Sequence, residues 1–282
     1  MGLSSYRNDG LTFDVDDSDG DGEVVVLLHG FPQSRTSWAA LTPHLVSAGY
    51  RVLAPDQRGY SPGARPRRRR DYAIDLLAGD VLALADEAGA DRFHVVGHDW
   101  GAGAAWALAE RHPERLLTMT SLSTPHPLAM AASMVRSNQL LKSWYMLFFQ
   151  LPWLPEATIR STAGGRRIRD AFVESGMATE EADDRLDMLR RGAARGALGW
   201  YRGLPFAGRS HDGKGQVPAL YVYSTGDVAL GRLAADLTEN YVGGAYRYEV
   251  LDGVSHWIPD DATDLIAPMI LDHLATASAA GA

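Results

Sequence analysis

The residues best placed to do chemistry form the pentapeptide GHDWG at positions 97–101. Two glycines four residues apart, where a strand ends and a helix begins, can form a strained turn that displays its central side chain. That side chain is Asp99, and the glycines permit the tight packing and unusual backbone angles that such a turn needs. The alternative, that Asp99 only caps a helix, leaves the glycines unexplained. We therefore predict that Asp99 is a nucleophile.

A nucleophile of this kind needs a base, and the base needs an acid to orient it. Asp227 stands just after an apolar run, and His256 stands in a loop further on. The order nucleophile, acid, histidine is typical of folds that carry a strained nucleophile turn. Asp227 has no close competitor, because the chain contains no Asp or Glu between Glu114 and Glu156. The alternative for Asp227 is an ordinary turn aspartate.

The elements that must position these residues alternate between strands and helices. Short apolar runs at 24–28, 51–54 and 93–96 are rich in β-branched residues and stop at His-Gly, Pro or Gly, which is typical of buried strands. Apolar residues recur at helical spacing over 73–88. Strand, helix, strand in this order predicts a parallel sheet, whose active sites form where strands end and helices begin.

The alternation stops at residue 127 and resumes at about 219. Residues 127–211 read as helical and aromatic-rich, so we expect them to form an inserted helical cap. Residues 1–126 and 212–282 would then form one α/β core with a mostly parallel sheet, closed by a helix after residue 259. Two further histidines have structural interpretations. We expect His98 to be buried beside the nucleophile, and His273 on the last helix to lie at the surface.

Composition excludes several kinds of partner. The 35 acidic side chains exceed the 27 basic ones and give a net charge of -8, which argues against nucleic acid or an anionic membrane as the main partner. The basic run at 65–70 is expected to be a solvated loop. With no cysteine there is no disulfide or thiolate chemistry. The first residues carry no targeting pattern, so we expect a cytoplasmic protein. We expect no cofactor and no metal, and either a monomer or a homodimer.

Four motifs together resemble the α/β-hydrolase family, in the branch of epoxide hydrolases and haloalkane dehalogenases that use an aspartate nucleophile. They are HGFP at 29–32, DQRG at 56–59, GHDWG at 97–101 and GVSHW at 253–257. The resemblance covers nearly the whole chain. It implies that the backbone N–H groups of Phe31 and Trp100 form an oxyanion hole.

A carboxylate nucleophile limits the reactions that such a site can catalyse. Attack on a carbonyl would give a high-energy anhydride, whereas displacement at a saturated carbon gives an alkyl ester that a second step can hydrolyse. His256, oriented by Asp227, would activate the water for that step. The resemblance extends to two cap segments, 144–152 and 199–202, which look like those that carry the ring-opening tyrosines of epoxide hydrolases. It implies that Tyr145 and Tyr201 donate the proton to an epoxide oxygen.

The sequence therefore predicts an epoxide hydrolase that forms a vicinal diol from a small hydrophobic epoxide and water. Predicted substrate-binding residues are Phe31, Trp100, Trp144, Phe149 and Trp257. Two alternatives stay open. A haloalkane dehalogenase would use the same aspartate and could hold a halide with tryptophans, although Phe31 stands where many of those enzymes have an asparagine. A non-catalytic ligand-binding member of the fold would need none of the five predicted catalytic residues.

Overall fold

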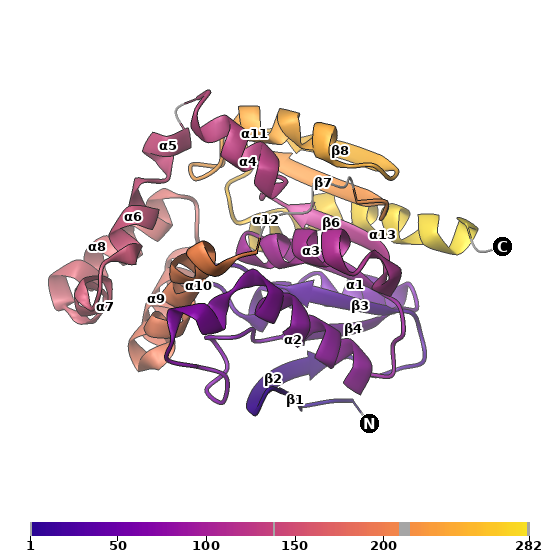
Figure 1. The fold of residues 1–282 in the computed structure, drawn as a ribbon, viewed down its shortest axis with the longest axis horizontal. Helices are drawn as coiled ribbons and strands as arrows, with labels where there is room; N and C mark the ends of the chain where they lie inside the picture. Colours follow the sequence, from indigo (N-terminus) through magenta and orange to yellow (C-terminus); the bar gives the residue numbers. More distant parts are fainter. Residues whose placement is uncertain (1, 138, 209–214, 281–282) are drawn as a thin grey trace.

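A computed structural model describes residues 2–137, 139–208 and 215–280 (Figure 1). Its centre is one eight-stranded sheet in the order β1-β2-β4-β3-β5-β6-β7-β8, in which only the pairs β1–β2 and β2–β4 are antiparallel. The strands are β1 Ser5–Asn8, β2 Leu11–Asp17, β3 Val24–Leu28, β4 Arg51–Pro55, β5 Phe93–His98, β6 Leu116–Leu122, β7 Ala219–Ser224 and β8 Tyr246–Leu251. The predicted α/β fold class is confirmed.

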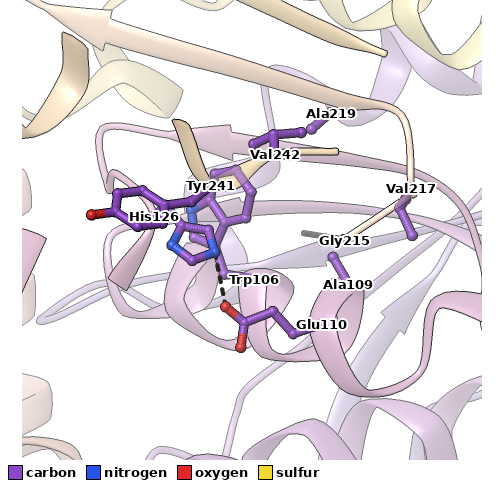
Figure 2. Close-up of a pocket in the computed structure, with 9 residues that line it drawn as sticks. All are labelled: Trp106, Ala109, Glu110, His126, Gly215, Val217, Ala219, Tyr241 and Val242. Carbon is purple, nitrogen blue, oxygen red and sulfur yellow. Dashed lines mark ion pairs between the residues drawn. The ribbon is translucent and has the colours of Figure 1, made fainter. Parts of the chain in front are cut away.

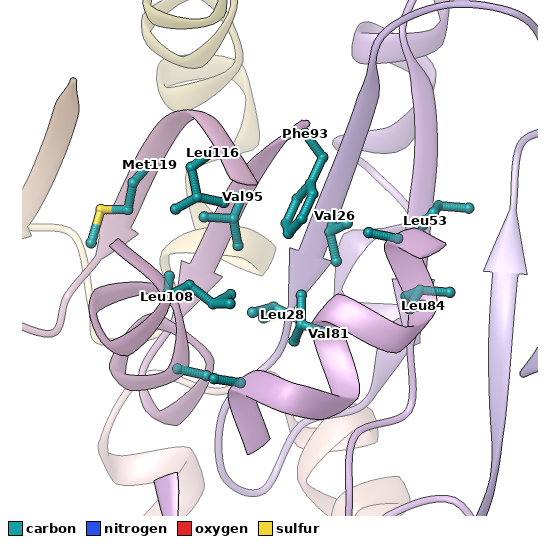
Figure 3. Packing of buried hydrophobic residues seen from close by; sticks show 14 of the residues in the cluster. Val26, Leu28, Leu53, Val81, Leu84, Phe93, Val95, Leu108, Leu116 and Met119 are labelled. Carbon is teal, nitrogen blue, oxygen red and sulfur yellow. The ribbon is translucent and has the colours of Figure 1, made fainter. Parts of the chain in front are cut away.

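Helices cover both faces of the sheet because its central strands are apolar on both sides. In β3, Val26 and Leu28 pack toward α2 and α3 (Figure 3), whereas Val25 and Leu27 pack toward α1 and α13. The helices of the core are α1 Thr42–Ser47, α2 Ile74–Glu87, α3 Trp100–Arg111, α11 Arg232–Leu237, α12 Ile258–Asp261 and α13 Thr263–Ala280. The helices on both faces hold the sheet in place. The site residues follow the ends of β3, β5, β7 and β8, which lie at one edge of the sheet.

A helical region is inserted between β6 and β7 and lies over one end of the sheet in Figure 1. Its helices are α4 Pro127–Met134, α5 Gln139–Lys142, α6 Trp144–Gln150, α7 Leu154–Arg160, α8 Thr162–Glu174, α9 Thr179–Met188 and α10 Ala194–Gly203. The predicted helical insertion is therefore present. Its predicted end at residue 211 lies outside the described residues, so the boundary stays a prediction. Among the helices described, none has the length and hydropathy needed to cross a bilayer.

Two expectations were wrong or incomplete. His273 is buried, with its Nε2 atom 3.1 Å from the carbonyl oxygen of Met119, because its face of α13 packs against β6. The antiparallel pair β1–β2 was not predicted. Its tight turn at Asp9-Gly10 has positive φ at both residues, and such Asp-Gly pairs are a recognised hairpin signal.

Candidate active site

Asp99 stands on a strained turn between β5 and α3, with φ of 49° and ψ of -119°. Both flanking glycines are required by close backbone approach. A Cβ atom at Gly97 would lie 2.5 Å from the backbone nitrogen of Ala102, and one at Gly101 would overlap the carbonyl oxygen of Leu28. The turn therefore has the strand–turn–helix geometry that displays a central side chain above the sheet.

The two carboxylate oxygens of Asp99 have different surroundings. The backbone N–H of Phe31 donates a hydrogen bond of 2.8 Å to Oδ1. Oδ2 lies 3.7 Å from Nε2 of His256. Burial acts to raise the pKa of Asp99, but the hydrogen bond and positive charge of His256 outweigh it and lower that pKa. Asp99 is therefore ionised, with one oxygen held by the backbone and the other directed to the histidine.

The oxyanion hole predicted from the sequence consists of the backbone N–H groups of Phe31 and Trp100. Trp100 is the first residue of α3, so its N–H has no partner within the helix. Asp99 immediately precedes it, and the N–H of Phe31 already contacts the carboxylate. The loop that carries Phe31 is tied down by His29, whose carbonyl oxygen accepts a hydrogen bond from the side chain of Gln57 and whose Nε2 accepts one from the Gln57 N–H at 3.2 Å.

His256 is oriented by Asp227. Its Nδ1 lies 2.7 Å from Oδ2 of Asp227, while Oδ1 of the same carboxylate accepts hydrogen bonds from the N–H groups of Ala229 and Leu230 at 2.7 and 2.9 Å. Burial opposes a charge on His256, but Asp227 and Asp99 raise its pKa to about 10. At neutral pH the ring is an imidazolium between two carboxylates.

His98 contacts the backbone of the loop that carries His256. It is fully buried, which confirms the expectation, and its Nε2 lies 2.8 Å from the carbonyl oxygen of His256. Ser123, which follows β6, donates to the same oxygen at 3.2 Å. Gln33 places its Oε1 2.6 Å from Nδ1 of His98. Ser123 and Gln33 were missed from the sequence, although each stands just past a strand end, where site residues gather.

Tyr145 on α6 and Tyr201 on α10 lie together over the nucleophile. Their ring centroids are 6.0 Å apart, and the ring of Tyr201 also contacts those of Phe31 at 5.4 Å and Trp100 at 4.9 Å. Burial and, among the charges, the negative charge of Asp99 raise the pKa of both phenols. Both hydroxyl groups are therefore protonated and can donate a proton beside the carboxylate.

Of the predicted substrate-binding residues, Phe149 packs with the aromatic residues of the site, whereas Trp144 and Trp257 lie elsewhere. Phe149 packs against Phe31 and Tyr201, with centroids 5.6 and 4.9 Å apart. Trp144 does not join them, because its side chain is 66% exposed on the outer face of α6, and this corrects the prediction for Trp144. Trp257 is buried beneath α8, where its indole N–H donates to Ser175 at 3.1 Å, which indicates a packing role.

A cavity of about 320 Å³ lies between the core and the inserted helices. Asp99, Trp100, Tyr145 and Tyr201 all line it. Most of its other walls are apolar side chains. Within the described part of the chain, no group of three or more His, Cys, Asp or Glu side chains is arranged to hold a metal ion. The arrangement joins an ionised carboxylate, a charged histidine and two neutral phenols at one apolar cavity.

Comparison with known proteins agrees with this architecture. The family model for the alpha/beta hydrolase fold matches residues 23–166. The AB hydrolase superfamily protein YfhM of Bacillus subtilis is 34% identical over 90% of this chain and 91% of its own length. Epoxide hydrolase A of Mycobacterium tuberculosis is 31% identical over 89% of this chain and 90% of its own length.

Among solved structures, epoxide hydrolase A of Mycobacterium thermoresistibile superimposes with a TM-score of 0.82 at 27% identity, covering 96% of this chain and 97% of that one. The fold and the family match define an α/β-hydrolase. Within that family, the chain belongs with the epoxide hydrolases and their relatives.

Proposed function

We propose that this protein is an epoxide hydrolase that adds water to an apolar epoxide through a covalent ester on Asp99. The observation that carries the proposal is the pair of buried phenols, Tyr145 and Tyr201, beside an ionised carboxylate that is held by the N–H of Phe31. An epoxide oxygen leaves as an alkoxide and needs an acid, whereas a halide needs only hydrogen-bond donors. Two neutral phenols at one nucleophile therefore favour the epoxide.

In the first step, Oδ2 of Asp99 attacks a ring carbon of the epoxide, and the carbon–oxygen bond of the ring breaks. Tyr145 or Tyr201 gives its proton to the departing oxygen, which leaves a tyrosinate and a hydroxyalkyl ester. The ester is neutral, so His256 loses one of the two carboxylates that raise its pKa. His256 can then pass its proton to the tyrosinate and become a neutral base.

In the second step, neutral His256 takes a proton from water, and the hydroxide attacks the ester carbon of Asp99. Negative charge develops on Oδ1, where the N–H of Phe31 already donates, and Trp100 offers a second N–H. When the intermediate collapses, His256 protonates the departing alkoxide and the diol is released. The acid form of Asp99 then returns its proton to His256, which restores the starting charges.

The test is a comparison of products from matched substrates. Styrene-type, aliphatic and alicyclic epoxides should give diols, while haloalkanes of the same size should release no comparable halide. If halide release is faster than diol formation, the protein is a haloalkane dehalogenase and the role of the two phenols is wrong. If neither product forms, the non-catalytic ligand-binding alternative replaces the enzyme.

A further inference from the structure

The cavity extends well beyond the reacting groups, along one face of α3. Residues of this helix that line it are Trp100, Gly103, Ala107, Glu110 and Arg111, which recur at the spacing of a single helical stripe. A stripe of that extent is roughly 16 Å long at the rise of an α-helix. The residues in its middle are small, and a Cβ atom added to Gly103 would lie 3.9 Å from the Cε3 atom of the Trp100 side chain. The helix therefore leaves an open channel away from Asp99.

The middle of this channel is apolar. Met130 and Met134 of α4 contribute to its walls, as do Ile74 and Leu77 of α2 and Leu204 after α10. Methionine side chains adapt to irregular apolar ligands. A small epoxide occupies only the end at Asp99, so the remaining length fits an apolar chain attached to the epoxide.

The far end of the channel is polar, and its main group is Arg111. The side chain is 11% exposed, and its buried Nε atom has no hydrogen-bond partner among the described residues. The Nη1 atom forms an ion pair with Asp75, whose carboxylate is half exposed, so Nε is the donor that remains for a ligand. Buried guanidinium N–H groups without partners are costly, so this end can accept a ligand oxygen.

Glu110 brings a carboxylate to the same end. Its Oε1 lies 2.8 Å from Nε2 of His126 as an ion pair (Figure 2), although this contact does not have the angles of a hydrogen bond. The Nδ1 atom of His126 accepts the N–H of Leu128, so the Nε2 atom that faces Glu110 carries a proton. Glu110 therefore keeps the capacity to accept a further hydrogen bond from a ligand.

We propose that the far end of this channel binds a neutral polar group, such as a hydroxyl, at the end of an apolar chain that carries the epoxide. This inference rests on the proposed epoxide hydrolase function. A hydroxyl can accept from Nε of Arg111 and donate to Glu110, whereas a hydrocarbon end leaves that Nε donor unpaired. An anionic end would meet two carboxylates, Glu110 and Asp75, against one guanidinium. Arg111 is therefore a residue that determines specificity, remote from the reacting atoms.

The experiment compares three substrates of equal length, namely the terminal epoxides of undecene, undecenol and undecenoic acid. For the intact protein, kcat/KM should be highest for the alcohol and exceed that of the hydrocarbon by about tenfold, because a hydrogen bond to a charged group contributes strongly. Arg111→Met should lower the alcohol to the level of the hydrocarbon. Styrene oxide does not reach Arg111, so its turnover should be unchanged and shows that the variant is folded.

Two further variants separate specificity from structure. Asp75→Asn removes the ion pair of Arg111 but leaves the guanidinium in the channel, so the alcohol preference should persist. Ala107→Phe should block the channel, slowing all three long substrates at least about tenfold while sparing styrene oxide. An equal loss in Asp75→Asn and Arg111→Met would mean that Arg111 acts only through its ion pair, and would overturn the inference.

Different results would contradict the proposed function and the inference about the channel. Turnover of styrene oxide with no preference among the three long substrates, or with a preference for the acid, contradicts the inference about the channel and leaves the proposed function intact. Absence of diol from every epoxide contradicts the proposed function and the inference with it.

Discussion

The core and the inserted helices hold their parts of the site in different ways. On the core side, Asp99 and Asp227 accept hydrogen bonds from backbone N–H groups, and His256 is fixed by Asp227. On the side of the inserted helices, Tyr145 and Tyr201 are held mainly by contacts among aromatic rings. The nucleophile Asp99 and the base His256 follow strand ends, which hold them in fixed positions. The positions of the proton donors Tyr145 and Tyr201 depend on how the inserted helices pack.

The largest effect is expected on the core side. Asp99→Ala removes the group that forms the first covalent bond, so turnover should fall by about 10⁴-fold or more, as for other nucleophiles. Steady-state diol formation measures this, and a far-ultraviolet circular dichroism spectrum like that of the unaltered protein shows that the fold is intact. Residual activity within about tenfold of the unaltered protein would rule out Asp99 as the nucleophile.

On the side of the inserted helices, we expect the two phenols to bind the epoxide oxygen together and to share the role of proton donor. Each of Tyr145→Phe and Tyr201→Phe should slow ester formation by about 10² to 10⁴, the usual contribution of a general acid. The double variant should have almost no epoxide turnover, since no donor remains. Stopped-flow or quench-flow measurement of the first step tests this. Full epoxide turnover in both single variants would contradict the role of the phenols.

A smaller effect concerns stability and pH. The pKa of His256 is raised from 6.5 to about 10, so the imidazolium stabilises the folded protein fully below pH 6.5 and that contribution is lost as pH rises toward 10. Relative to His256→Gln, the unaltered protein should lose on the order of 4 kcal/mol of unfolding free energy across this interval. Denaturant titrations at several pH values measure it.

The variant Asp99→Ala gives a second test of the pKa of His256, because it removes one of the two carboxylates that raise this pKa. The loss of stability should begin near pH 6.5 in both proteins, but in Asp99→Ala it should end at lower pH and be smaller in total. A stability difference between the unaltered protein and His256→Gln that stays flat from pH 6.5 to 10 would mean that His256 is neutral in the resting site.

The same contrast explains what could be predicted from the sequence. The strands around residues 24–28 and 93–98 and the glycine pair at 97 and 101 have local signals, because strand burial and tight turns depend on neighbouring residues. The pairing of Asp227 with His256 followed from chain order. Residues whose position depends on helix packing were harder. Trp144 was expected in the pocket, but only the packing of α6 decides which of its aromatic residues face inward.

His273 and Arg111 illustrate the same limit. A histidine on a terminal helix reads as a surface residue until the helix face is known, and here that face lies on β6. Arg111 is the last residue of α3, where a basic side chain is ordinarily explained by the helix dipole. Its place at the end of a channel depends on α4 and α10, which are distant along the chain.

The most direct test of the two-step scheme is to trap the ester in His256→Gln. Ester formation needs no base, but its hydrolysis does, so this variant should accumulate a covalent adduct on Asp99. Intact-protein mass spectrometry after addition of an epoxide should show an increase equal to the mass of that epoxide, and peptide mapping should place it on the peptide that contains Asp99. No mass increase, under conditions in which the unaltered protein forms diol, would contradict the covalent mechanism.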